Sequence, residues 1–206
     1  MPIKSIDRSQ VGVLVIDAQP HFFDVMAESQ EPVLARIEHL LMLAGGLGLP
    51  VLATFEHPVN EKGTLPARLE RVFPVHGQRL SKHTFDCCRE PAIRNTIKKT
   101  AIKQLAVAGA ETDVCVLQSV IGLLKMGLEI FLLEDCVFTS EPDPRPALER
   151  MYRSGAIPCT FKTLYYELMA GVGEVSQIDR KRLLPSDFMW PEALPPRCPK
   201  SVTEER

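Results

Sequence analysis

Short apolar runs alternate with longer amphipathic stretches along most of this chain. The run Val11–Ile16 is continuous and rich in β-branched residues, which is typical of a strand buried on both faces of a parallel sheet. Further runs predict strands at residues 50–55, in a short segment ending near Lys82, and at residues 105–108, 128–133 and 156–160. Helical periodicity predicts helices at residues 32–47, 90–100, 114–126, 144–153 and 163–170, and residues 58–77 are expected to form a loop.

This alternation of strands and helices predicts an α/β fold, a three-layer α/β/α sandwich of Rossmann-like type with a mostly parallel six-stranded sheet. We expect the domain to span residues 1–177. Residues 178–206 change character and predict an irregular, proline-rich tail, because prolines recur there at Pro185, Pro191, Pro195, Pro196 and Pro199.

Charge and composition argue against two classes of binding partner, nucleic acids and membranes. The 206 residues fit one domain, and 24 basic against 26 acidic residues give a net charge of −2 without a basic block, so neither nucleic acid nor a membrane surface is an indicated partner. The N-terminus lacks the apolar core of a signal peptide, and no apolar run is long enough to span a bilayer. The six cysteines show no disulfide-scaffold spacing, which favours a reduced, cytoplasmic protein.

Three residues with chemical potential follow predicted strands, at the sheet edge where open parallel sheets carry their sites. Asp17 ends the first strand, Lys82 lies near the end of the third, and Cys115 follows a turn at Gly109. We expect the Cys115 thiol to face the first turn of a helix, whose dipole would lower its pKa. Each residue also has a structural reading: a buried apolar cysteine, a turn-capping aspartate and a solvated surface lysine.

Five sequence motifs occur in the order found in the isochorismatase-like cysteine hydrolases, and the chain resembles this family over residues 8–170. The motifs are Asp-x-Gln at 17–19, Lys-x-x-Phe at 82–85, GAETDVCV at 109–116, LEDC at 133–136 and ALERM at 147–151. The family includes nicotinamidases, N-carbamoylsarcosine amidases and an uncharacterised branch, to which the pattern is most similar.

The resemblance implies a catalytic triad of Asp17, Lys82 and Cys115, in which Cys115 attacks and Asp17 moves protons. It also implies a cis peptide bond between Ala110 and Glu111, and an oxyanion hole made by the backbone amides of Glu111 and Cys115. A homo-oligomer, a dimer or larger, is a further implication.

Four residues are candidates for contact with a small-molecule substrate. Gln19, Phe22 and Phe23 closely follow Asp17, and Phe85 closes the Lys-x-x-Phe motif. Packing in the core is the alternative role for Phe22 and Phe23.

No metal and no cofactor are expected. Phe55 stands where nicotinamidases carry a metal-binding aspartate, and no second histidine closely follows His57, whereas a zinc-type site needs three or more protein ligands. His57, His76 and His83 are scattered along the chain. The glycines at 45, 46 and 48 follow a helix and precede a strand, which is the wrong order for a dinucleotide fingerprint.

The sequence therefore predicts a metal-independent cysteine hydrolase that acts on a small amide, carbamoyl or related compound. Two alternatives remain open: a catalytically silent family member that serves as an oligomeric binding scaffold, and an isochorismatase-type vinyl ether hydrolase. A nucleotide-dependent oxidoreductase is disfavoured because the glycine fingerprint is missing.

Overall fold

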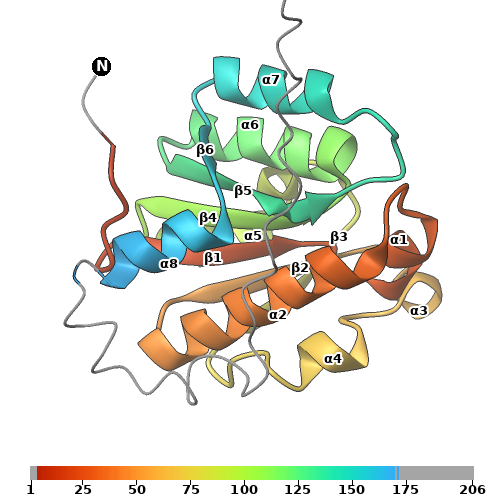
Figure 1. The fold of residues 1–206 in the computed structure, drawn as a ribbon, viewed down its shortest axis with the longest axis horizontal. Coiled ribbons are helices and arrows are strands. Elements are labelled where there is room, and N and C mark those ends of the chain that lie inside the picture. Colours follow the sequence, from red (N-terminus) through yellow and green to blue (C-terminus); the bar gives the residue numbers. More distant parts are fainter. Residues whose placement is uncertain (1–3, 170, 172–206) are drawn as a thin grey trace, which may run out of the picture.

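The computed structural model describes residues 4–169 and 171, and it contains one sheet of six parallel strands in the order β3-β2-β1-β4-β5-β6 (Figure 1). This confirms the predicted three-layer α/β fold. The strands are β1 (Val11–Ile16), β2 (Val51–Glu56), β3 (Gln78–Lys82), β4 (Gln104–Ala110), β5 (Glu129–Phe138) and β6 (Ile157–Cys159). The predicted tail, residues 178–206, lies outside the described residues.

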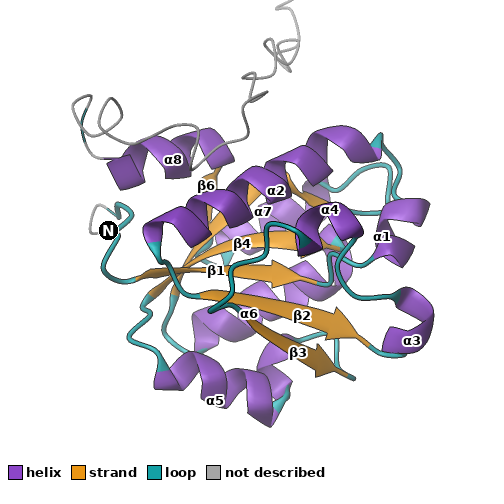
Figure 2. Ribbon diagram, turned by 90° about the horizontal axis from the view of Figure 1, so that it is seen from below, coloured by secondary structure: helices purple, strands orange, loops and turns teal. Residues whose placement is uncertain are grey.

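Helices cover both faces of the sheet. Figure 2 shows α2 (Gln30–Leu47), α4 (Ala67–Glu70) and α8 (Phe161–Met169) over one face, and α5 (Pro91–Lys99) and α6 (Leu117–Lys125) over the other. Helix α7 (Arg145–Arg153) joins the second group, because its Met151 packs in the same apolar cluster as Ile93 of α5. The arrowheads of β1 to β4 point toward α1 (Pro20–Val25) and α3 (Val59–Lys62), and since all strands are parallel the carboxyl edge of the sheet lies at that end.

The central strand β1 shows why its sequence lacks polar alternation. Val13 and Val15 belong to the apolar cluster on one face, while Leu14 and Ile16 belong to the cluster on the other. Since both faces are covered by helices, every residue of the strand is buried. The first polar residue after this strand, Asp17, is also fully buried, so the apolar run ends at the carboxyl end of the strand while the chain is still inside the protein.

Helix α2 ends through a glycine, but later than the first glycine of its sequence. Gly45 and Gly46 lie inside the helix, and Gly48 takes the left-handed conformation with φ +67° at its end. Its amide donates a hydrogen bond to the Gly45 carbonyl at 3.2 Å. The helix thus matches the prediction except that it starts two residues earlier, at Gln30.

Three predictions of local structure were wrong. The expected loop at residues 58–77 contains two single-turn helices, α3 and α4, and α1 was not predicted. Four to six residues are too few to show a helical period, so contacts with neighbouring elements decide these turns. The predicted helix 114–126 is two elements, a π-helical turn η2 (Thr112–Val116) followed by α6.

Strand β5 extends to Phe138, beyond the predicted end at residue 133, and the polar residues in its second half explain why the prediction stopped too early. Its pairing with β4 shifts in register between Val107 and Gly109, at the point where Glu134 and Asp135 interrupt the apolar run. Asp135 accepts a hydrogen bond from the Phe161 amide at 2.8 Å, which gives this carboxylate a partner at the sheet edge. In the described part of the chain, no helix is both long enough and apolar enough to span a membrane.

Candidate active site

Four polar side chains converge where four strands end. Asp17 follows β1, Glu56 is the last residue of β2, Lys82 is the last residue of β3, and Cys115 lies in η2 after β4. Because these four strands are neighbours in the sheet, their carboxyl ends meet at one edge, which faces α1 and α3 in Figure 2. The register pairs Glu56 directly with Lys82 across β2 and β3.

A close approach of two strands brings Asp17 to the side of Cys115. Gly109 of β4 lies opposite Ile16 of β1, and a Cβ at this glycine would stand 1.8 Å from the Ile16 carbonyl oxygen. Its φ of +113° is also a conformation that only glycine adopts readily. Asp17 itself has φ +46°, a left-handed conformation in which Asp is enriched. The turn after β1 can therefore approach the turn before Cys115 only because position 109 is a glycine.

The Lys82 ammonium is at the centre of the cluster and is fully buried. Its Nζ lies 2.6 Å from Asp17 Oδ2, 3.3 Å from Glu56 Oε2 and 3.3 Å from Cys115 Sγ. A buried charge is tolerated only when it is paired and hydrogen-bonded, and this lysine has partners on three sides. The structure thus places the three residues of the predicted triad in contact, with Lys82 between the other two.

Glu56 is a member of the site that the sequence motifs did not reveal. Its Oε2 accepts a hydrogen bond from the Cys115 thiol at 2.9 Å, and its Oε1 pairs with Lys62 of α3. Its position in the sequence could have indicated a role in the site, because Glu56 is the last residue of a buried strand and Asp17 directly follows one. The metal-binding pattern of nicotinamidases corresponds instead to Phe55 and His57, the residues on either side of Glu56.

The Cys115 thiol has a raised pKa, and the prediction of a lowered pKa was wrong. Burial raises the pKa of Cys115, the Asp17 charge raises it further, and Lys82 only partly opposes them. The thiol lies in the π-helical turn η2, directly before the first turn of α6. At neutral pH the resting cysteine is therefore a thiol.

The carboxylates and the ammonium shift one another's protonation. Burial raises the pKa of Asp17 above its ordinary value, against the opposing effect of Lys82. Burial alone would also raise the pKa of Glu56, but hydrogen bonds from Cys115 and Lys62 and the nearby ammonium charges bring it below the ordinary value. Burial disfavours the charged form of Lys82, yet the Asp17, Cys115 and Glu56 groups outweigh it and raise the pKa of this lysine.

The backbone around the thiol forms a compact turn. The peptide bond between Ala110 and Glu111 is cis. The amides of Val114 and Val116 both donate to the Glu111 carbonyl, at 3.1 and 3.0 Å, and the Glu111 side chain accepts from the Ser140 amide at 3.0 Å. The oxyanion hole at the amides of Glu111 and Cys115 stays a prediction, since it requires a substrate to define the position of the oxygen.

Gln19 positions Glu56. Its Nε2 donates to the carbonyls of Glu56 and Gly63, at 3.2 and 2.7 Å, and its Oε1 accepts from the Glu56 amide at 2.7 Å. The side chain is fully buried, and both ends of its amide are engaged by backbone groups. These contacts connect the end of β2 to the segment after α3, so the expected substrate contact of Gln19 stays a prediction beside an observed positioning role.

The three candidate phenylalanines have different surroundings. Phe23 is buried and stacks on Phe138 with ring centroids 4.3 Å apart, which is core packing. Phe22 is also buried, and the Lys62 ammonium lies 5.4 Å from its ring centroid. Phe85 is half exposed in the loop after β3. Substrate contact by these side chains stays a prediction, which Phe22 fits best because its neighbour Lys62 pairs with Glu56.

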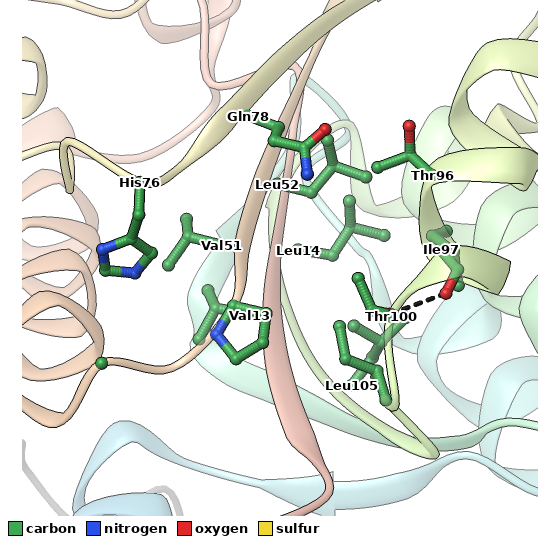
Figure 3. A pocket seen from close by; sticks show the side chains of 13 residues that line it. Val13, Leu14, Val51, Leu52, His76, Gln78, Thr96, Ile97, Thr100 and Leu105 are labelled. Atoms are coloured by element: carbon green, nitrogen blue, oxygen red, sulfur yellow. Dashed lines mark hydrogen bonds between the residues drawn. The ribbon is translucent and has the colours of Figure 1, made fainter.

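The three scattered histidines do not form one cluster, because His76 lies apart from the other two. His57 and His83 stack with ring centroids 3.8 Å apart beside the ends of β2 and β3, whereas the His76 ring contacts the Leu49 carbonyl at 2.9 Å. His76 lines a cavity of about 200 Å³ at the amino ends of the strands, together with Val13, Val51 and Leu105 (Figure 3). This cavity is at the edge of the sheet opposite the charged cluster.

Among the residues that the structure describes, two groups of side chains have the spacing of metal ligands. Ligand atoms of Asp17, Glu56 and Cys115 lie within 4.8 Å of one another, but the Lys82 ammonium contacts all three residues and takes the position of a cation. The second group is Asp86 with the adjacent Cys87 and Cys88, where an Asp86 oxygen already accepts the Cys88 amide at 2.9 Å. The first group is thus an ion-pair cluster built around a lysine.

The fold and this cluster define a three-layer α/β protein with a cysteine, a lysine and two carboxylates in contact at the carboxyl edge of its sheet. Residues 11–163 match the Isochorismatase domain, and the chain belongs to the isochorismatase family. It is 27% identical over 139 residues to isochorismatase family protein 1A of Dictyostelium discoideum, covering 66% of this chain and 68% of the relative.

Two YcaC proteins are also similar to this chain. The probable hydrolase YcaC of Escherichia coli is 25% identical over 158 residues, covering 75% of this chain and 76% of the relative. Its crystal structure, described as an octameric hydrolase of unknown specificity, covers 90% of this chain and 93% of that chain, with a TM-score of 0.79 and 22% identity. YcaC of Pseudomonas aeruginosa, solved with hexane-2,5-diol and covalent acrylamide, covers 83% of this chain and 86% of that chain, with a TM-score of 0.78 and 25% identity.

Proposed function

We propose that this isochorismatase-family protein is a metal-independent cysteine hydrolase that cleaves a small amide, carbamoyl or related compound. The observation that carries the proposal is the buried Lys82 ammonium, which touches the Cys115 sulfur and two carboxylates at once. An arrangement that costs this much desolvation has a physical use where a thiolate charge must be stabilised during a reaction.

In the proposed reaction Cys115 attacks the carbonyl carbon of the substrate. The thiol proton passes to a carboxylate of the cluster, and the ammonium of Lys82 stabilises the negative charge that develops on sulfur. The carbonyl electrons move to oxygen, where the amides of Glu111 and Cys115 would bind the oxyanion. The leaving nitrogen takes this proton back from the carboxylate as the C–N bond breaks, which releases the amine and leaves an acyl enzyme; water then hydrolyses the thioester, and its proton restores the thiol.

The relatives support hydrolysis without identifying the substrate. E. coli YcaC is described as a probable hydrolase, and P. aeruginosa YcaC carries acrylamide covalently. Acrylamide is an electrophile that thiolates attack, so it is a suitable probe for the nucleophile of this chain as well. The octameric state of E. coli YcaC also supports the expected homo-oligomer, which light scattering of the purified chain would measure.

The proposal is tested by labelling and by turnover. The protein is incubated with acrylamide at pH 7.5, and adducts are mapped by peptide mass spectrometry. We expect Cys115 to react at least tenfold faster than Cys87, Cys136 or Cys159, which are equally buried but have no lysine contact in the described residues. A panel of amides and carbamoyl compounds, with isochorismate included, is then assayed with Cys115→Ser, and Cys159→Ser serves as the control.

The expected result is turnover of at least one amide or carbamoyl compound that Cys115→Ser abolishes and Cys159→Ser retains. Turnover that survives Cys115→Ser would contradict the proposed mechanism. Turnover of isochorismate alone would replace the proposed reaction with vinyl ether hydrolysis.

A further inference from the structure

A second group of potential metal ligands follows β3 and is not used by the proposed reaction. Asp86 caps the short 3₁₀ turn η1 (Cys87–Arg89), and the ligand atoms of Asp86, Cys87 and Cys88 all lie within 4.8 Å of one another. Both thiols are free, and Cys87 is fully buried while Cys88 is 8% exposed. Two sulfurs and one carboxylate oxygen are a donor set that suits zinc and the softer divalent cations.

We propose that Asp86, Cys87 and Cys88 bind one divalent cation of the zinc class, through two thiolates and one carboxylate oxygen. The ion displaces one proton from each thiol to solvent, and water completes its four-coordinate shell. The ion is structural, so the proposed reaction at Cys115 stays independent of metal. This inference goes beyond the proposed function and departs from the expectation, drawn from the sequence, that the chain binds no metal.

The active-site group shows by contrast what this second group lacks. Its three side chains have the same ligand spacing, and the fully buried Lys82 ammonium provides the positive charge among them. In the second group, the one ion pair that the described residues form is between Asp86 and Arg89, at 3.9 Å, and the Arg89 side chain is 76% exposed. The Arg94 guanidinium donates to the Cys88 carbonyl at 3.0 Å, so it is engaged by the backbone. An exposed ion pair contributes little, which leaves the charge of a metal ion to stabilise these ligands.

Without a cation, the thiols of this group resist ionisation. A hydrogen bond with Cys87, burial, and the negative charges that Cys87 and Asp86 can carry all raise the pKa of Cys88. The three groups repel one another when they are deprotonated, and a divalent cation among them removes this repulsion. A thiol that coordinates such an ion is deprotonated outright, so metal binding here releases protons.

The backbone holds these ligands in place through contacts of its own. Asp86 Oδ1 accepts the Cys88 amide at 2.9 Å, and a carboxylate has a second oxygen with which to bind an ion. The Cys87 amide donates to Ser119 Oγ of α6 at 3.0 Å. Asp86 also packs against α6 at Gly122, where a Cβ would collide with Oδ1. Since the turn is fixed against one helix, little further ordering is needed when an ion binds.

Metal titration of the full-length chain tests the proposal, with Cd²⁺ and Zn²⁺ as probes. The reduced, metal-free protein is titrated with Cd²⁺, whose bonds to thiolates absorb in the ultraviolet, and the Zn²⁺ affinity is measured by competition with a chromogenic chelator. The variants are Cys88→Ser, Asp86→Asn, Cys115→Ser and Cys159→Ser, of which the last is the matched control, because Cys159 is a buried free cysteine outside both groups. Thermal unfolding followed by circular dichroism establishes that each variant is folded. If Cys88→Ser does not fold, Cys88→Ala takes its place, because it removes the thiol without introducing a hydroxyl.

We expect one ion to bind per chain, with two thiolates attached to it. Loss of a residue that only supports a ligand lowers metal affinity by roughly 10- to 100-fold, so Cys88→Ser, which removes a ligand, should lower it by about 100-fold or more. Asp86→Asn keeps an acceptor for the Cys88 amide but loses the charge, and should weaken binding by about tenfold. Cys115→Ser and Cys159→Ser should bind as the wild type does. Because each ion displaces two thiol protons, the affinity should rise by up to about 100-fold per pH unit near neutral pH.

Equal affinity in Cys88→Ser and the wild type would overturn the inference, and so would the absence of saturable thiolate absorption with Cd²⁺. Binding that Cys115→Ser abolishes and Cys88→Ser retains would also overturn it, because the ion would then lie in the active-site group. None of these results changes the labelling of Cys115 by acrylamide, so failure of this inference and failure of the proposed function are distinguishable.

Discussion

The two edges of the sheet are built from the same strands and have opposite chemistry. At the carboxyl edge, β1, β2, β3 and the turn after β4 bring two carboxylates, an ammonium and a thiol into contact. At the amino edge the same strands line a cavity with mostly apolar side chains, among them Leu14, Val51 and Leu52 (Figure 3). Strand direction accounts for the difference, because the residues at the carboxyl ends of the strands supply the buried charged groups.

The difference shows where each edge derives its stability. The amino edge depends on apolar burial, so substitutions there act on stability through packing and leave the charged cluster in place. The carboxyl edge depends on mutual pairing of buried charges, in which removing one member leaves the others without partners. Substitutions at the carboxyl edge should therefore affect both stability and reactivity, whereas those at the amino edge should affect stability through packing and leave reactivity unchanged.

The largest effect is expected from Lys82→Met. Methionine fills a similar volume but leaves the fully buried Asp17 carboxylate without its counter-ion, which should lower the free energy of unfolding by about 3–5 kcal/mol. Alkylation of Cys115 at neutral pH should fall below detection. Urea unfolding measures the stability, and Lys98→Met on the exposed side of α5 is the control, expected to change it by less than about 0.5 kcal/mol. Equal stability of the two variants would show that the buried charges are not coupled.

Gly109→Ala should have the next largest effect. The new Cβ would stand 1.8 Å from the Ile16 carbonyl oxygen, so β1 and β4 must separate where Asp17 approaches Cys115. We expect a loss of about 3 kcal/mol or more in the free energy of unfolding. Gly127→Ala is the matched control, since Gly127 also has a positive φ, of +85°, but meets nothing within 4 Å. A similar loss of about 1 kcal/mol in both would show that backbone conformation matters and the close approach does not.

A smaller, pH-dependent effect is expected from Glu56. Its pKa is lowered below the ordinary value of 4.5, so the folded state binds fewer protons than the unfolded state in the acid range. The stabilisation from the ionised carboxylate is present above pH 4.5 and is lost as the pH falls through the folded-state pKa. Urea unfolding from pH 6.5 to 3.5 should therefore show the stability difference between wild type and Glu56→Gln shrinking at acid pH. A difference that is constant over this range would contradict the lowered pKa.

Thr96→Val at the amino edge should have the smallest effect. Thr96 lines the cavity opposite the charged cluster, and valine has nearly its shape. The free energy of unfolding should change by less than about 0.5 kcal/mol, and the rate of Cys115 alkylation should be unchanged. A reduced alkylation rate would mean that the two edges are coupled through the strands, and the contrast between them would fail.

The sequence supported most of the fold because buried parallel strands leave a direct trace. Val11–Ile16 reads as an unbroken apolar run since both of its faces are covered, and Asp17 marks the carboxyl end of the strand. The short helices α1, α3 and α4 left no such trace, because their stability comes from neighbours distant in the chain. The second half of β5 was missed for the same reason: Asp135 is satisfied by the Phe161 amide, a partner 26 residues away.

The site divides in a similar way. Asp17, Lys82 and Cys115 could be named because each follows a strand, whereas Glu56 was overlooked and Gln19 was expected to bind substrate while its amide holds the Glu56 backbone. The protonation of the thiol was also misjudged, since a turn beside a helix suggested a lowered pKa. Burial and two carboxylates on other strands raise it instead.

By itself the sequence determined the order of strands and helices, the polar residues that end the strands, and the kinship of the chain, because periodicity and motifs are local properties. The tertiary structure decided which of those polar groups touch, and that a lysine occupies the place of a cation among three side chains with the spacing of metal ligands. The physical reason is that desolvation and charge pairing depend on distances between separate strands. Those distances arise only when the strands are side by side in the sheet.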